Sequence, residues 1–393
     1  MSDTPTPGNR EGFALAAAIL AVVAVGALVT AGFFAASQEG RAALSTYHGT
    51  EAFHLAEQGL NTVLGTWTRA NFEQLDTGQV VSALEETVSR GGDRAVGAYS
   101  VHVRRMGPRL FFVQSEGRLL RPDGQPGAVR RIGQTVRIVS FDVPPDRAMQ
   151  VFGGLDVRGN SRIRGDDFIP NNWADCDYDG EKAAVVAKDT SRIQRSGAAK
   201  IEGDPPKLED PDLDHSDFLE YGDLDFDALF ALAEKLYPHG TTVTNTAPVL
   251  AADGSCDRSP ISNWGAPLDT AHACHEYFPI IGGEGDLHFA SSSSGQGILL
   301  VQGDLRITGG FEFYGIVVVR GKFTTAGTGG KINGIVMVYS GGDLDTDNLS
   351  AGNTVVNYSS CPIQRAQNYN EYTSRAVPIT RRSWIDLSAA GVS

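Results

Sequence analysis

The feature that most constrains the fold is an uncharged apolar stretch of 24 residues, Phe13 to Ala36, behind a short polar leader. As an α-helix it would be about 36 Å long, enough to cross a hydrocarbon core of about 30 Å. The apolar part of a secretory signal spans only about 7 to 15 residues and usually follows a basic patch. Here the leader holds one Arg and two acids, and Phe34 occupies the place where cleavage behind Ala36 would need a small residue. We therefore predict a membrane helix that is retained.

The chain behind this stretch predicts that the helix continues. Apolar residues recur there at spacings of three and four, namely Leu44, Tyr47, Ala52, Leu55, Ala56, Leu60, Val63, Leu64 and Trp67. Such spacing gives one apolar stripe on an amphipathic helix. No proline occurs between Pro7 and Pro108, so nothing breaks the helix. We expect one helix of about fifty residues, with its first half in lipid and its second half on a soluble domain.

The order of these features resembles the class III signal of type IV pilins and type II secretion pseudopilins. The leader ends in Gly12, and Phe13 opens the apolar helix. The segments GFALAAAIL and AFHLAEQGL are most similar to the PilX-type minor pilins. The resemblance covers about the first seventy residues. It implies that a prepilin peptidase cuts between Gly12 and Phe13 and methylates the new amino terminus.

Two positions depart from the pilin pattern. Glu11 stands where pilins usually carry a basic residue, with Arg10 one place back. Ala17 occupies the fifth mature position, where pilins usually carry a Glu that pairs inside lipid with the amino terminus of a neighbouring subunit. The missing acid resembles the pseudopilins and minor pilins of a filament tip. The alternative is that this position has drifted in a low-abundance subunit.

Charge and cysteine content narrow the function. The net charge of −14 argues against nucleic acid as a partner, because phosphate contacts need Lys and Arg. The four cysteines lie beyond the membrane helix and can oxidise if the leader is cytoplasmic. Of three possible pairings we favour Cys256 with Cys274 and Cys176 with Cys361. Reduced structural cysteines are the alternative, and the CxxC spacing of zinc sites is absent.

A period-two pattern begins near Ala98. The runs AYSVHVRRM, LFFVQS and RRIGQTVRIVSFDV alternate as strands do, and turn residues separate them. Short links between three strands indicate an antiparallel meander, which the amphipathic half of the helix can cover. The fold class is therefore α+β, with a pilin-like helix and sheet over residues 37–145.

Beyond Pro145 short apolar segments are separated by glycines at regular spacing. Gly303 and Gly321 are 18 residues apart, and Gly315 and Gly334 are 19 apart. A period near twenty favours a β-solenoid, a short parallel β-helix, over an antiparallel sandwich. The rows expected to point inward are Leu305, Ile307, Phe313, Ile316, Val318, Phe323, Ile332, Ile335 and Val338. We assign this head to residues 146–365 and a tail to 366–393.

We predict that residues 170–295 form an insertion within the head, because their composition differs from that of the glycine-spaced repeats. They hold an acidic run that ends in a predicted helix from Phe226 to Tyr237. Long excursions from a regular scaffold often carry recognition surfaces, so we place any recognition function here.

One pattern in this insertion resembles a metal site. Asp175, Asp177 and Asp179 alternate before Gly180, as in the first half of a calcium loop. The twelfth position is Val186 and lacks the bidentate Glu, so a solvated acidic turn is the alternative. Calcium is the only cofactor that the sequence suggests.

Catalytic motifs are absent from the sequence. Neither HExxH nor GxSxG occurs, and the one histidine cluster, His272 and His275 beside Cys274, is explained by a loop next to a disulfide. We expect no enzyme activity.

Together these features predict a structural minor pilin or pseudopilin, incorporated into a type IV pilus or type II secretion-like filament or priming or capping its tip. The expected partners are a prepilin peptidase, other pilins and, before assembly, the inner membrane, which the chain crosses once with its leader (residues 1–12) cytoplasmic. The alternative is a tip adhesin whose head insertion binds a surface glycan or protein.

Overall fold

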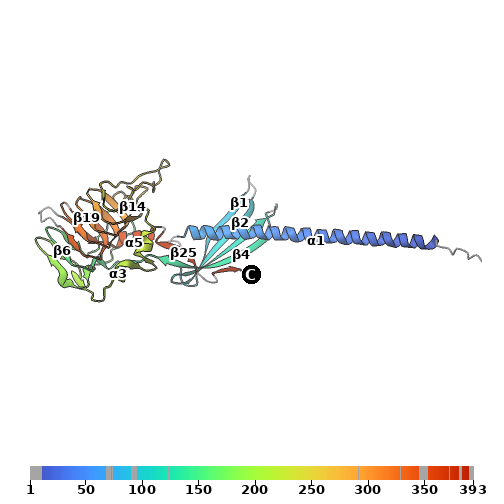
Figure 1. Cartoon of the computed structure of the whole chain (residues 1–393), viewed down its shortest axis with the longest axis horizontal. Coiled ribbons are helices and arrows are strands. Elements are labelled where there is room, and N and C mark those ends of the chain that lie inside the picture. The colour runs from blue at the N-terminus through green and yellow to red at the C-terminus, as the bar shows by residue number, and fades with distance from the viewer. Residues whose placement is uncertain are drawn as a thin grey trace, which may run out of the picture. The chain divides into compact units, whose positions relative to one another are not determined.

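Figure 1 shows the computed structural model, which describes residues 11–67, 72, 74–89, 95–121, 124–290, 292–327, 329–344, 353–370, 372–379 and 383–388. The chain forms two compact units. The stem unit comprises residues 1–66, 76–136 and 378–393, and the head unit comprises 67–75 and 137–377. The head unit carries 35 acidic and 20 basic residues, a net charge of −15, whereas the stem unit carries 12 and 13, a net charge of +1. The acidity of the protein therefore belongs to the head.

The stem is built on helix α1 (Glu11–Gly65), which runs for 55 residues without a break and confirms the predicted single helix. Its sheet has the order β1-β2-β3-β4-β25, and β26 pairs with β4. The bounds are β1 (Val80–Ser89), β2 (Ala95–Gly107), β3 (Leu110–Leu120), β4 (Pro126–Ser140), β25 (Ser374–Pro378) and β26 (Trp384–Asp386). Strands β2 and β3 pair antiparallel, as expected, and β1 pairs antiparallel with β2.

The sheet is larger than the three strands that the sequence predicted. Strand β1 was not predicted, because Val81, Leu84 and Val88 are spaced three and four residues apart, as on a helix. The segment assigned to a tail, residues 366–393, contributes β25 and β26 to this sheet.

Small residues set the packing of α1 on the sheet. Ala52 and Ala56 are fully buried, and a Cβ at Gly117 of β3 would clash with the backbone of both. From Ala52 onward the residues of the predicted apolar stripe are buried, except Leu55 and Leu64, which are half-buried, whereas Leu44 and Tyr47 are more than half exposed.

The head contains two sheets of parallel strands whose registers repeat along the chain. Ile298 pairs with Ile316, and Ile316 pairs with Ile335, which are offsets of 18 and 19 residues. The first sheet contains β14 (Lys235–Tyr237), β16 (Ile280–Gly283), β18 (Ser294–Val301), β20 (Glu312–Val319) and β22 (Lys331–Val338). The second contains β15 (Thr241–Val243), β17 (Leu287–Phe289), β19 (Leu305–Ile307), β21 (Phe323–Thr325) and β23 (Gly342–Leu344).

Successive strands of the two sheets stack on one another as coils. The first and last strands of the head segment 146–365 lie in the same coil. Strands β5 (Arg147–Val151) and β24 (Val355–Tyr358) each pair in parallel with β22. From β5 the chain passes outward to one end of the stack and then to β14 at the other end, from which it winds back. The strands on the outward path are β6 (Leu155–Val157), β7 (Arg162–Arg164), β8 (Ala183–Ala187), β9 (Ile193–Arg195), β10 (Lys200–Glu202) and β11 (Lys207–Glu209).

This path corrects the prediction of a single insertion over residues 170–295. Strands β8 to β11 and β14 to β17 lie in that range and belong to the stacked sheets. The segments outside the stack are shorter: η1 (Thr190–Arg192), α3 (Ser216–Leu219), β12 (Glu220–Tyr221), β13 (Leu224–Asp225), α4 (Phe226–Phe230) and the loop 244–279. The strands of three to five residues carry too little pattern to be recognised singly.

The helix predicted to end at Tyr237 ends instead at Phe230, and β14 follows. Lys235 and Tyr237 are buried in that strand while Leu236, expected on the apolar side of a helix, is 42% exposed. To join the first sheet, this segment must bury alternate residues. That requirement outweighs the helical spacing of the leucines in the segment.

All nine predicted inward residues are buried. In the second sheet the neighbouring Arg306 is exposed and Thr324 is half-buried, whereas the middle of the first sheet is buried on both faces. Ile316 and Val317, on opposite faces of β20, are both fully buried. The outer face is covered because α5 (Ser360–Asn368) packs across β18, β20 and β22.

Candidate functional site

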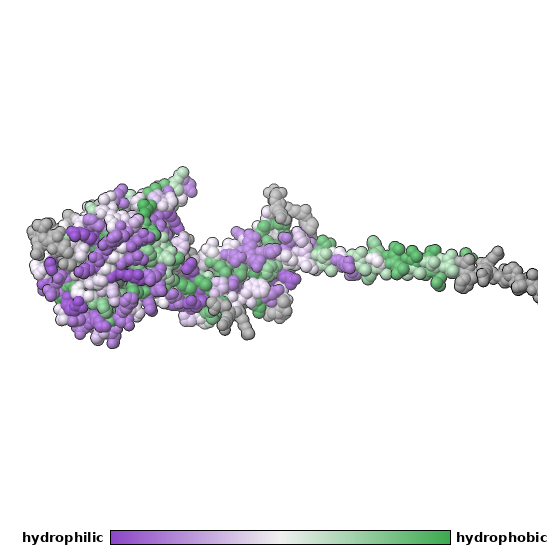
Figure 2. All heavy atoms as spheres, viewed as in Figure 1, coloured by the Kyte–Doolittle hydropathy of each residue, from purple (hydrophilic) through white to green (hydrophobic). Residues whose placement is uncertain are grey.

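The first half of α1 is an exposed and mostly apolar surface. Figure 2 shows it as a continuous hydrophobic length of the helix. Its large side chains are between 57% and 78% exposed, and they are Leu15, Ile19, Leu20, Val22, Val23, Val25, Leu28, Val29, Phe33 and Phe34. By length and composition this is a helix that could cross a membrane. Such a surface in water would be unfavourable by roughly 25 cal/mol per Å².

Two polar side chains of this half form hydrogen bonds to backbone carbonyls of the same helix. Thr30 donates to the carbonyl of Gly26 at 2.8 Å, and Ser37 donates to the carbonyl of Phe34 at 2.8 Å. Hydroxyls bonded within the helix can enter lipid at little cost. Gly26 and Gly32 have open space beside them, so a neighbouring helix could approach closely at these positions.

The structure places the predicted processing and assembly residues together at the beginning of this surface. Gly12, Phe13 and Ala17 all lie within the first two turns of α1. Ala17 is exposed. Their roles in cleavage and assembly remain predictions.

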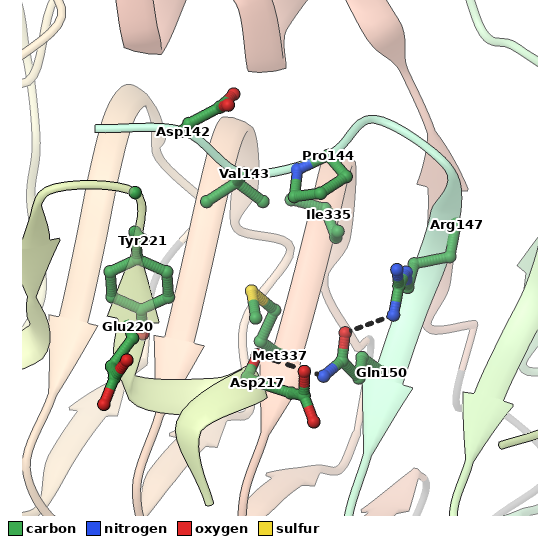
Figure 3. Close-up of a pocket in the computed structure, with 11 residues that line it drawn as sticks. Asp142, Val143, Pro144, Arg147, Gln150, Asp217, Glu220, Tyr221, Ile335 and Met337 are labelled. Atoms are coloured by element: carbon green, nitrogen blue, oxygen red, sulfur yellow. Dashed lines mark hydrogen bonds between the residues drawn. The ribbon is translucent and has the colours of Figure 1, made fainter. Parts of the chain in front are cut away.

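Two cavities of the head have linings of opposite net charge. The first, of about 310 Å³, has an apolar floor of Ile335 and Met337 from β22. Figure 3 shows Arg147 beside this floor, bonded to Gln150 at 2.5 Å, with carboxylates of Asp217 and Glu220 nearby. The second, of about 490 Å³, is lined by polar groups that include two cations and one carboxylate, Arg192, Lys322 and Asp156.

A third cavity of about 350 Å³ lies between two loops over β20 and β22 and is called here the loop pocket. It is lined by Phe168, Pro170, Asn171, Asn172, Pro267, Leu268, Glu312, Tyr314 and Lys331. Burial alone would raise the pKa of Glu312, but hydrogen bonds from Lys331 at 2.8 Å and Tyr314 at 2.6 Å outweigh it, and the pKa is lowered. Glu312 and Lys331 therefore form an ion pair at the base of this pocket.

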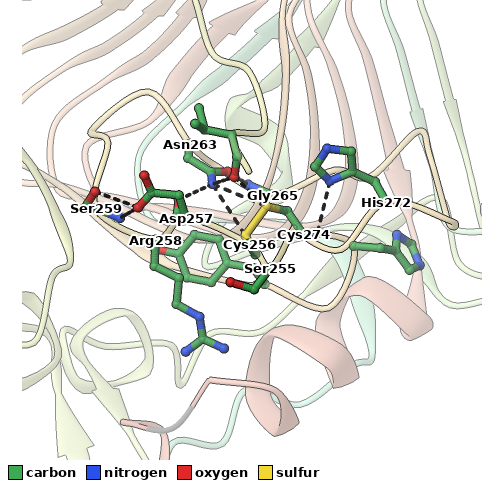
Figure 4. The surroundings of a disulfide bond; sticks show 12 residues. Ser255, Cys256, Asp257, Arg258, Ser259, Asn263, Gly265, His272 and Cys274 are labelled. Carbon is green, nitrogen blue, oxygen red and sulfur yellow. Dashed lines mark hydrogen bonds between the residues drawn. A yellow bond between two sulfur atoms is a disulfide. The ribbon is translucent and has the colours of Figure 1, made fainter. Parts of the chain in front are cut away.

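Two disulfides hold the loops of the head, with the pairing favoured from the sequence. Cys176 joins Cys361 on α5, across 185 residues, and Cys256 joins Cys274, across 18. Figure 4 shows Asn263 beside the second bond, where its side-chain amide donates to the carbonyl of Asp257 at 2.6 Å.

A buried cation links the two disulfide-bonded regions. Arg365 of α5 donates to the carbonyl of Ala174 at 2.5 Å and lies over the ring of Trp173 at 4.7 Å. Its other nitrogen lies 3.0 Å from Nε2 of His275, whose Nδ1 lies 3.1 Å from the carbonyl of Ala266. Because a carbonyl only accepts and a guanidinium only donates, His275 must carry its proton on Nδ1 and be neutral. Burial, helped by Arg365, lowers its pKa accordingly.

The predicted calcium ligands are not gathered around one point. The carboxylate of Asp179 accepts from Tyr358 at 2.8 Å and lies 3.4 Å from Nζ of Lys182. Across the described part of the chain, no three His, Cys, Asp or Glu side chains are placed to hold a metal ion. Calcium binding at Asp175, Asp177 and Asp179 gains no support from this geometry. It stays a prediction that requires excess EDTA to lower the melting temperature.

Sequence reasoning missed Trp173 and Arg365, which organise the loops. It noted His275 but assigned it no role beyond its place beside Cys274. The signal available was the nearness of Trp173 and Arg365 to two cysteines, Cys176 and Cys361, whose pairing was predicted.

No protein-family model matches the chain, and no curated protein matches it. Among solved structures the chain is similar to the competence-associated pilin ComZ from Thermus thermophilus. The identity is 14%, and the match covers 85% of this chain and 96% of that chain with a TM-score of 0.26. At this TM-score the likeness adds nothing to the geometry described above.

Proposed function

We propose that the protein is a pilin-like structural subunit of a type IV pilus or a related filament. The observation that carries this proposal is α1: one unbroken helix exposes large apolar side chains along its first half and packs on an antiparallel sheet in its second. A helix of this kind needs lipid before assembly and other helices afterwards. The residues at its start, Gly12 and Phe13, fit the cleavage point of the pilin resemblance.

Each segment of the chain has its own role in such a subunit. Residues 1–12 are a cytoplasmic leader that a prepilin peptidase removes, and 13–36 hold the subunit in the inner membrane. The pilin-like segment, residues 37–145, joins other pilins. The segment 146–365 of the head unit is a short β-solenoid on the outside, which the parallel registers of its two sheets support.

The mature amino terminus tests this proposal directly. After co-expression with a prepilin peptidase, mass spectrometry should find a methylated chain that begins at Phe13. A Gly12→Val variant should remain uncut, and the matched Gly8→Val variant should be cut normally. A wild-type chain that still begins at Met1 would remove the pilin assignment and leave a membrane-tethered head.

We further propose a position at the filament tip, which rests on Ala17. A tip subunit has no following subunit whose amino terminus would need a carboxylate partner. An Ala17→Glu variant should therefore enter filaments in larger amounts and along their length, as immunogold labelling would show. Wild-type labelling spread along the shaft would contradict the tip position.

A role in adhesion is the second candidate, favoured by the head's loops, which two disulfides and Arg365 hold over a regular scaffold. Deleting residues 170–290 is not a clean test of it, because strands β8 to β17 lie in that range and the head would lose its stack. Substitutions at a defined binding site within the loops would test adhesion without removing strands of the stack.

A further inference from the structure

The loop pocket is formed by two chain segments that are far apart in sequence and fixed to each other. Trp173, behind the first loop, donates its indole N–H to the carbonyl of Pro267 in the second at 2.9 Å. The ring of Trp173 also stacks on Tyr314, a lining residue, at 5.5 Å. The first loop is tied to α5 through Cys176 and the second belongs to the Cys256–Cys274 region. The pocket is therefore preorganised, which lowers the entropic cost of binding.

Its polar groups offer unused hydrogen-bonding capacity. All three bonds to the Glu312 carboxylate, from Tyr314, Lys331 and Asn333, end on Oε1. Within the described residues, Oε2 of Glu312 and the side-chain amides of Asn171 and Asn172 have no partner. Lys331 has further N–H groups beyond its bond to Glu312. The lining thus combines acceptors and donors within one small volume.

The charge of the loop pocket separates it from the other two cavities. Its single carboxylate and single ammonium are paired with each other, so the site is neutral. The first cavity has an excess of carboxylates, and the second an excess of cations. A neutral ligand with both donors and acceptors fits the loop pocket better than an ion, which would be left with an uncompensated charge.

The rim of the pocket is apolar. Leu268 is 66% exposed and Ile169, next to the lining residue Phe168, is 38% exposed. Pro170 and Pro267 complete this edge. Apolar side chains around convergent amides and a carboxylate match a ligand with C–H faces and hydroxyl groups.

We propose that the loop pocket binds one unit of a neutral saccharide. The hydroxyls of the sugar donate to Oε2 of Glu312 and accept from Lys331, Asn171 and Asn172, while its C–H face lies against the apolar rim. This proposal goes beyond the structural role in a filament and does not depend on processing or assembly.

The test uses the full chain in lauryldimethylamine oxide micelles, because detergents with sugar headgroups would compete. The probes are the methyl glycosides of glucose, galactose and N-acetylglucosamine, followed by saturation-transfer NMR and calorimetry. At least one should bind, with a Kd near the millimolar range typical of single sugar units in small sites. Glucuronate and glucosamine, which carry charge, should bind at least tenfold more weakly.

The key variant is Asn171→Ala with Asn172→Gly, which removes both amides. Glycine suits position 172, whose φ of 65° is left-handed. Binding should fall about tenfold with an unchanged melting temperature, since each lost hydrogen bond weakens binding severalfold. Glu220→Gln at the first cavity is the control and should bind as the wild type does. Absence of binding to all three glycosides, or full binding by the double variant, overturns the proposal whatever the fate of the filament assignment.

Discussion

Single residues at close contacts decide how the stem packs. Gly117 lies where α1 approaches β3, and the backbone of Ala52 and Ala56 occupies the space that any Cβ there would need. Gly59 makes a similar approach from the helix side, toward Tyr99 and Ser115. Glycine therefore allows a close backbone approach at Gly117 and makes room for sheet side chains at Gly59.

Gly117→Ala should destabilise the stem by about 3 kcal/mol, because neither helix nor strand can move away without exposing Ala52 and Ala56. The measurement is chemical unfolding of the full chain, with hydrogen exchange at β3. Gly40→Ala is the control: it lies in α1 with open space around it and should stabilise the helix by about 0.5–1 kcal/mol. Unchanged exchange in the Gly117 variant would contradict this packing.

His275 should make the head sensitive to acid. Its pKa is lowered in the folded state, so below about pH 6.5 the unfolded chain binds more protons than the folded one. Stability is then fully present above pH 6.5 and is lost as the pH falls toward the folded pKa, by up to about 1.4 kcal/mol per pH unit. Burial is the largest cause of the lowered pKa, and Arg365 adds to it, while the hydrogen bond to the carbonyl of Ala266 and the charges of Glu276 and Asp269 oppose it.

Melting temperatures between pH 7.5 and 5 would measure this loss. The His275→Gln variant, which cannot gain the proton, should show a smaller decrease over the same range. Equal pH dependence of the two proteins would show that another group controls acid sensitivity.

At the scale of elements, the disulfides differ in what they hold. Cys176–Cys361 connects α5 to a loop 185 residues earlier, whereas Cys256–Cys274 closes an 18-residue loop. Loop entropy predicts that the longer closure stabilises the fold more, by about 2 kcal/mol. Guanidinium unfolding of the two double Cys→Ser variants would compare them. A larger loss from the short loop would point to local packing around Asn263 instead.

The elements also show what the sequence can predict. Helix α1 was readable because uncharged and amphipathic patterns extend over many turns, and the glycine spacing indicated the offsets of the parallel strands. The order of strands was not readable, since β5 and β24 become neighbours only through β22. The loop pocket was hidden for the same reason: Trp173 and Pro267 are 94 residues apart and meet only in the folded head.

For the whole molecule, the chain path makes the head depend on its last segments. The coil that begins with β5 is completed by β24, and α5 then covers the first sheet. These pieces are synthesised after every other coil, so the stack cannot close early.

A chain that stops after Leu344 should therefore lack a folded head, because it loses β24, α5 and Cys361. Limited proteolysis should digest residues 137–344 of this variant rapidly. Removal of residues 1–36 should instead leave a soluble, protease-resistant protein, since that half of α1 is exposed along its length. A resistant head in the first variant would show that the stack folds without its closing strands.

The coil that holds β5 and β24 lies inside the stack and not at an end of it. Coils could therefore be added or lost at either end, beyond β15 on one side and β9 on the other, while the entry and exit of the chain stay where they are. Heads of different length could in this way evolve on an unchanged stem, with the subunit's assembly surface preserved as its outward surface diverges.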